Sequence, residues 1–225
     1  MAYLLGVEVK EIYIYPLGGI SKFNMDLNIK IFEELLILVM GPIFQFIAYF
    51  ILLKIIPNRK DIINIYHFGI LSFNLLPIYP LDGGKLMNLL FNKFIPYKLS
   101  LRLINIISYL IILSILIFIK KTTNIIVMVI LLLFLVIKES KRIKYLYNKF
   151  LLERYLNKYK FNKSKIITNT DHFYRERNHL INKNNKYYLE EEYLENLYKN
   201  NKKSWLFKNC YAIIYLSLEK VNMGH

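Results

Sequence analysis

Residues 74–85 read Asn-Leu-Leu-Pro-Ile-Tyr-Pro-Leu-Asp-Gly-Gly-Lys, and they end an apolar segment with two prolines, an acid and two glycines. Pro77 and Pro80 remove backbone hydrogen-bond donors, so the stretch predicts a break in the helix that precedes it. Irregular backbone at membrane depth is tolerated only where protein or a polar cavity surrounds it. We therefore expect a cavity beside Asp82.

The sequence around this stretch is unusually apolar. The chain has 225 residues, of which 55% are hydrophobic and 21% charged, and its mean hydropathy is +0.30. An ordinary soluble enzyme is therefore an unlikely class. Four long uncharged segments, at 35–53, 62–81, 103–119 and 122–137, predict four membrane spans. At 1.5 Å per residue they reach about 24 to 30 Å, so the last two are short and a hairpin is their alternative.

The charges predict how the spans are oriented. The chain carries 31 Lys and Arg against 16 Asp and Glu, and residues 138–225 hold 19 of the former against 9 of the latter. Positive segments stay on the cytoplasmic side, so we expect a multi-pass protein of the cell membrane with a cytoplasmic tail. Contact of the tail with anionic lipid is the simplest use of this charge. No nucleic-acid partner is expected, since no binding motif accompanies the charge.

The fold class predicted is an α-helical integral membrane protein with about four transmembrane helices, an N-terminal β-hairpin and a small α+β cytosolic tail. A β-branched and aromatic run at 7–15 precedes a turn at Pro16 to Gly19, which indicates the hairpin. The domains expected are a hairpin region (1–34), a membrane domain (35–137) and a basic tail (138–225). Within the tail we expect helices at 139–159 and 187–194, and strands within 205–218.

Asp82 is the residue for which chemistry is expected. A carboxylate in apolar surroundings costs about 2.5 to 3.5 kcal/mol unless it lies near the interface or has a cationic partner. A bound metal ion would offset that cost, and Gly83 and Gly84 would let the backbone approach closely. The alternative is an interfacial turn without a ligand. Asn74, eight residues or about two helical turns earlier, either helps at the site or makes a hydrogen bond between helices.

The stretch from Asn74 to Gly84 closely resembles the second signature of the site-2 protease family of intramembrane zinc metalloproteases. The N-terminal hairpin residues resemble that family's membrane-associated hairpin, and Gly41-Pro42 resembles its Gly-Pro helix element. Gln45 stands where Asn is common. The tail is similar to that of the shorter, sporulation-type members.

This resemblance implies an endopeptidase with Zn²⁺ as its cofactor and Asp82 as a zinc ligand. Asn74 would position an unwound substrate segment, and the hairpin around Gly18 and Gly19 would offer a strand edge to the substrate. Pro77, Pro80, Gly83 and Gly84 would support the site. The substrate class implied is a membrane-embedded or membrane-tethered protein, such as a pro-sigma factor in sporulation, and regulatory membrane proteins are possible partners.

One departure from the family pattern is large. The His-Glu-x-x-His signature, which supplies two zinc ligands and the general base, does not occur in this sequence. In relatives it lies just before the element that we align with Ala2 and Gly6. Either the start has been placed at an internal methionine, or the catalytic helix has been lost. The alternative function is then a non-catalytic membrane scaffold or regulator, and a small transporter ranks last.

The remaining reactive side chains are not expected to replace these ligands. His67 lies fifteen residues before Asp82, or about 22 Å along a continuous helix. His172, His179 and His225 lie in the polar tail, where a solvated or locally hydrogen-bonded role is expected. Cys210 is expected to pack in an apolar run.

Overall fold

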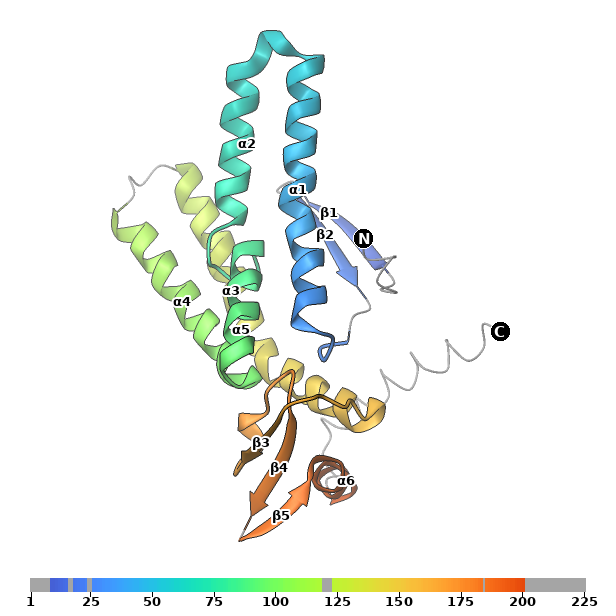
Figure 1. Ribbon diagram of the computed structural model, residues 1–225. Helices are drawn as coiled ribbons and strands as arrows, with labels where there is room; N and C mark the ends of the chain where they lie inside the picture. The colour runs from blue at the N-terminus through green and yellow to red at the C-terminus, as the bar shows by residue number, and fades with distance from the viewer. Residues whose placement is uncertain (1–8, 16–17, 24–25, 119–122, 184, 201–225) are drawn as a thin grey trace.

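The protein is mainly helical, with a β-hairpin toward the N-terminus of the chain and a small sheet with a helix toward its C-terminus (Figure 1). The computed structural model describes residues 9–15, 18–23, 26–118, 123–183 and 185–200. Among these, three helices are long and apolar enough to cross a membrane: α1 (Ile31–Ile55), α4 (Tyr97–Phe118) and α5 (Thr123–Asn157). The predicted fold class is thus confirmed, but a fourth membrane helix is not.

The N-terminal hairpin is present where the sequence predicts it. Strand β1 (Val9–Tyr15) pairs antiparallel with β2 (Gly18–Phe23), and Tyr15 lies opposite Gly18. Gly18 and Gly19 were expected in the turn, whereas they begin β2. Residues 16 and 17, between the two strands, lie outside the described part of the chain.

The second predicted span is not one helix. Helix α2 (Lys60–Asn74) pairs with α1 after a short 3-10 turn, η2 (Pro57–Arg59), and stops at Asn74. The chain then forms a non-helical turn, and helix α3 (Asp82–Phe94) continues toward the tail (Figure 1). The expectation of two helical turns between Asn74 and Asp82 is therefore wrong, because the prolines end α2 before the acid is reached.

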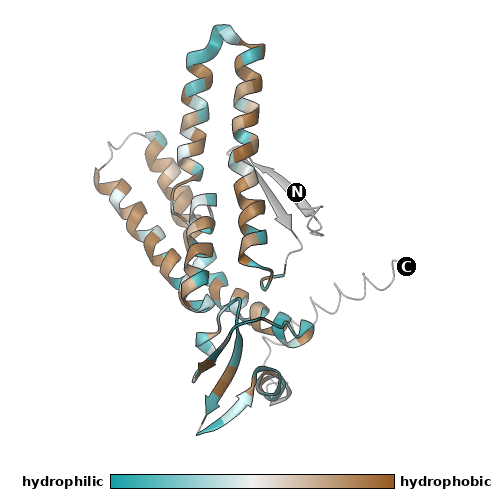
Figure 2. Ribbon diagram, viewed as in Figure 1, coloured by the Kyte–Doolittle hydropathy of each residue, from teal (hydrophilic) through white to brown (hydrophobic). Residues whose placement is uncertain are grey.

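Helix α5 joins two elements that were expected to be separate. The predicted span at 122–137 and the predicted tail helix at 139–159 are one helix of 35 residues. A helix of that length is about 52 Å long, well beyond the roughly 30 Å of a hydrocarbon core. Figure 2 shows the change along α5 from an apolar to a polar surface. We therefore assign the uncharged part, 123–137, to the membrane and the charged remainder to the tail.

The tail is a small α/β unit packed on the end of α5. Its sheet has the order β3–β4–β5, with β3 (Ser164–Ile167) parallel to β4 (Asn178–Lys183) and β4 antiparallel to β5 (Lys186–Leu189). A 3-10 turn, η3 (Thr170–His172), follows β3, and α6 (Glu190–Asn200) follows β5. Residues 187–189, expected in a helix, lie in β5, where they pair antiparallel with β4. The strands expected within 205–218 lie outside the described residues.

Two hydrophobic clusters hold these parts together. The first lies between α4, α5 and the tail sheet, with Tyr97, Phe150 and Ile181 among its buried members. The second joins α4 and α5 to the turn after α2 and is centred on Ile78 and Val136, both fully buried. The broken span is thus anchored through its turn.

Candidate functional site

The turn between α2 and α3 is ordered by its own hydrogen bonds and by one from α4. The N–H of Ile78 donates to the carbonyl of Leu76 (2.7 Å), and that of Leu81 donates to the carbonyl of Ile78 (2.8 Å). The N–H of Tyr79 donates to the hydroxyl of Ser108 on α4 (2.9 Å). Because each of these donors has a partner, irregular backbone can persist here at membrane depth.

Two glycines set how closely α3 approaches this turn. A Cβ added at Gly84 would lie 2.5 Å from the backbone of Ile78 and Tyr79, and one added at Gly83 would overlap the carbonyl of Leu75. Both glycines are buried. Any larger residue would push the first turn of α3 away, so this contact fixes where Asp82, the residue directly before them, is placed.

Asp82 is the first residue of α3 and faces α1. A Cβ added at Gly41 would lie 3.6 Å from Oδ2 of Asp82, while Oδ1 lies 3.2 Å from Nζ of Lys85. The side chain is 32% exposed, so the carboxylate is neither buried nor open to bulk solvent. The N-terminal end of a helix also favours a negative charge. Lys85 lies one turn along the same helix.

Asp82 lies beside the middle part of α1. Gly41 lies ten residues into α1, or about 15 Å from the end that contacts the tail. Asp82 faces Gly41 and is the first of the thirteen residues of α3. The carboxylate therefore lies near the middle of α1.

The described residues do not form a complete metal site by themselves. Catalytic zinc takes three protein ligands and keeps one open position. Within the described ranges, no group of three His, Cys, Asp or Glu side chains lies close enough to hold a metal ion. Asp82 can supply one oxygen ligand, so this part of the chain alone does not fit a full zinc centre.

Asn74 and His67, singled out from sequence, lie in different surroundings. Asn74 ends α2 and is half-buried, and no hydrogen bond from its side-chain amide to another described residue is found. His67 is buried in the α1–α2 pair, where its ring stacks on that of Tyr49 with centroids 4.2 Å apart. The backbone carbonyl of His67 accepts a hydrogen bond from Gln45 (3.1 Å).

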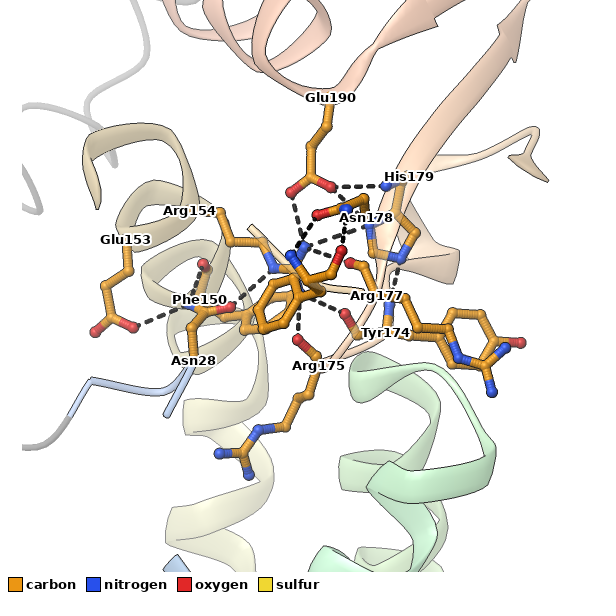
Figure 3. Close-up of polar contacts among 11 residues, drawn as sticks. Asn28, Phe150, Glu153, Arg154, Tyr174, Arg175, Arg177, Asn178, His179 and Glu190 are labelled. Carbon is orange, nitrogen blue, oxygen red and sulfur yellow. Dashed lines mark hydrogen bonds and ion pairs between the residues drawn. The ribbon is translucent and has the colours of Figure 1, made fainter. Parts of the chain in front are cut away.

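The tail holds a buried polar cluster that sequence reasoning missed (Figure 3). Arg154 near the end of α5 donates to Oδ1 of Asn28 (2.8 Å), to Oε1 of Glu190 (2.7 Å) and to the carbonyl of Tyr174 (2.7 Å). These partners lie up to 126 residues from it, and no local pattern signals such contacts. Arg154 therefore joins α5, the start of α6 and the segment before α1.

The histidines expected in the tail differ among themselves. The side chain of His179 is fully buried, and its Nδ1 lies 2.9 Å from Oε2 of Glu190 while its Nε2 accepts from the N–H of Tyr174 (2.9 Å). Its local hydrogen bonding is as expected, and a solvated role is wrong. His172 is exposed. His225 and Cys210 lie outside the described residues.

Comparison with known proteins gives two relatives. The chain is 30% identical over 168 residues to stage IV sporulation protein FB of Bacillus subtilis, a match that covers 70% of this chain and 58% of the relative. It is 31% identical over 123 residues to a zinc metalloprotease of Methanocaldococcus jannaschii, which covers 50% of this chain and 35% of that relative. The resemblance to the site-2 protease family is confirmed. No protein-family model matches the chain.

The site-2 protease resemblance agrees with the apolar helices of the structure. Three of them are long enough to span a bilayer, and the homologues are metalloproteases or sporulation proteins by name. Together these findings indicate a membrane protein with metalloprotease relatives. The chain spans less than two thirds of the length of either relative.

Proposed function

We propose that this chain forms part of an intramembrane zinc metalloendopeptidase of the site-2 protease type, in which Asp82 is a zinc ligand. The observation that carries the proposal is the placement of Asp82. The second predicted span is broken, and Asp82, at the start of α3, lies at the depth of Gly41 on α1. Gly83 and Gly84 let the first turn of α3 contact the preceding turn closely. An acid at that depth is costly without a cationic partner. Lys85 is one such partner, 3.2 Å away, and a metal ion would be a second on the side that faces α1.

The two histidine ligands and the general base would come from a His-Glu-x-x-His segment outside the 225 residues. A zinc ion bound by these ligands and by Asp82 would supply Lewis-acid chemistry and a water of lowered pKa. The residues of this chain would orient the carboxylate of Asp82 through the first turn of α3. The turn after Asn74 would keep lipid from the site, and the amide of Asn74 would hydrogen-bond an unwound substrate segment.

The substrate class proposed is a membrane-tethered protein precursor, such as a pro-sigma factor in sporulation. Strand β2 begins at Gly18 and Gly19, and the two-stranded hairpin has free edges to which an extended substrate could add. We place the tail on the cytoplasmic side because of its excess of Lys and Arg. The three long apolar helices would make the chain cross the membrane several times. Product release would then be into the cytoplasm.

Two experiments test this proposal. The in-frame nucleotides before the Met1 codon are read first, and a His-Glu-x-x-His codon series there supports the enzyme over a non-catalytic scaffold. The protein with that segment is then co-expressed with a membrane-tethered reporter. Asp82→Asn should abolish cleavage, whereas Asp61→Asn, an exposed acid in the first turn of α2, should not. Equal cleavage by both variants refutes the role of Asp82.

A further inference from the structure

A groove with a volume of about 650 Å³ lies between α4 and α5, near their ends that face the tail. Its walls come from the tail-facing half of α4, from α5 just beyond its uncharged part, and from η3. It shares no lining residue with the Asp82 site. The proposed proteolysis gives this groove no role.

One end of the groove is basic. Lys98 and Arg102 line it from α4, and Lys144 lines it from α5. Lys98 is paired with Asp171 of η3, with Nζ 2.6 Å from Oδ1. Arg102 and Lys144 are exposed, and neither makes an ion pair with any described residue. Two cations therefore remain available at the mouth of one groove, which suits an anionic ligand.

The other end of the groove is apolar and enters the membrane span. Arg102 directly precedes the uncharged segment of α4, and Ile106 and Tyr109 line the groove farther along that segment. Tyr109 is seven residues from Arg102, or about 10 Å deeper. Ile106 is 55% exposed and Tyr109 37% exposed, so both present surface to an occupant or to acyl chains. A soluble anion would gain nothing from this half.

A buried acceptor lies at the junction of the two halves. Asn105 lines the groove and is only 7% exposed, and its Oδ1 has no hydrogen-bond donor among the described residues. A buried carbonyl oxygen without a donor costs free energy. A ligand that carries hydroxyl groups next to its negative charge would supply the missing donor.

We propose that this groove binds an anionic glycerophospholipid of the tail-side leaflet. Its phosphate would lie at Arg102 and Lys144, a head-group hydroxyl would donate to Oδ1 of Asn105, and an acyl chain would lie along Ile106 and Tyr109. Basic pockets between membrane helices recognise lipid head groups in this way. Because the groove joins the tail to the membrane helices, a bound lipid would stabilise the contact between α4, α5 and η3.

The experiment titrates the detergent-purified full chain with phosphatidylglycerol and with phosphatidylcholine and follows lipid binding by native mass spectrometry. We expect phosphatidylglycerol to bind the more tightly. The double variant Arg102→Gln/Lys144→Gln should lower its affinity by about fivefold for each charge removed. The matched control is Lys138→Gln/Lys141→Gln, which removes two exposed charges from the same part of α5 outside the groove and should keep the wild-type affinity.

Two further arms keep the test decisive. Asn105→Ala, which changes no charge, should reduce the preference for phosphatidylglycerol, and it serves if the double variant fails to fold. Inorganic phosphate at millimolar concentration should not displace the lipid. Equal affinity of the wild type for both lipids, an equal loss in the control variant, or full displacement by phosphate would each overturn the proposal.

Discussion

Arg175 of the tail is ion-paired with Glu34 in the first turn of α1, with Nη1 2.6 Å from Oε2. The Arg175 side chain is 3% exposed, and its Nη2 also donates to the carbonyl of Ile29 (3.0 Å). One residue on, Glu176 accepts from the N–H of Ile31, the first residue of α1 (2.8 Å). The tail thus contacts the N-terminal end of α1, the helix whose Gly41 faces Asp82.

Loss of this contact should loosen α1 from the tail. We expect Arg175→Gln to lower the free energy of unfolding by about 2 kcal/mol, because the charge-assisted hydrogen bond to Glu34 is lost and the half-buried carbonyl of Ile29 loses a donor. Thermal unfolding in detergent measures the change. The control is Arg142→Gln, which removes an exposed pair with Glu139 and should cost less than about 1 kcal/mol. Equal shifts would contradict the linkage.

Gly84 should not tolerate a side chain. The Cβ of Gly84→Ala would lie 2.5 Å from the backbone of Ile78 and Tyr79, so α3 or the turn must move, at a cost of about 3 kcal/mol or more. Gly69→Ala in α2 is the matched control, since nothing lies within 4 Å of its Cβ and alanine favours a helix. Yield and thermal stability are compared, and similar stability of the two variants would show that the close approach is absent.

The hydroxyl of Ser108 should be needed for the turn. It accepts from the N–H of Tyr79 and is fully buried, so Ser108→Ala leaves that donor unpaired and should cost about 1 to 3 kcal/mol. The matched control is Ser114→Ala on the exposed side of α4, where the Ser114 hydroxyl donates to the carbonyl of Leu110. This variant should lower the free energy of unfolding only slightly. The difference in thermal unfolding between the two variants is the measurement. No difference would argue against a role for Ser108.

Acidification should lower the folding stability of the tail through protonation of His179. Burial lowers the pKa of His179, and the hydrogen bond to Glu190 only partly opposes that effect. The neutral ring accepts from the N–H of Tyr174, and protonation would remove that acceptor. Since the unfolded state binds the proton more readily, this stability is present above about pH 6.5 and is lost as the pH falls through the lowered pKa.

The measurement compares the unfolding of wild type and His179→Gln between pH 7 and pH 5. Glu153 acts in the opposite direction, because burial raises its pKa to about 7, so only the difference between the two proteins isolates His179. We expect the wild type to lose more stability than the variant on acidification. His172→Gln, which changes an exposed histidine, should follow the wild type. Parallel curves for wild type and His179→Gln would contradict the assignment.

The sequence predicts the fold where one local pattern decides it. Alternating β-branched and aromatic residues predict the hairpin, and uncharged runs predict α1, α4 and the first half of α5. Helix boundaries that were predicted from hydrophobic composition alone were wrong at two places. Apolar residues continue past Asn74, but the helix ends there, so the break predicted from Pro77 and Pro80 is confirmed and the span to residue 81 is wrong. The charged sequence after Ile137 does not interrupt α5.

The candidate site was only partly predictable for the same reason. The acid and its two glycines are adjacent in sequence, so a local motif reveals Asp82, Gly83 and Gly84. Their partners are not local. Gly41 on α1 and Ser108 on α4 are brought to the turn by packing between helices, and the Arg154 cluster joins segments more than 100 residues apart.

The zinc content of the purified protein, produced with a His-Glu-x-x-His segment in place, tests the central claim most directly. Zinc per chain is measured for the wild type, Asp82→Asn and the control Asp61→Asn by mass spectrometry of the metal. We predict about one zinc per chain for the wild type and the control, and clearly less for Asp82→Asn, because one of three protein ligands is lost. Wild-type zinc content in Asp82→Asn would contradict the account.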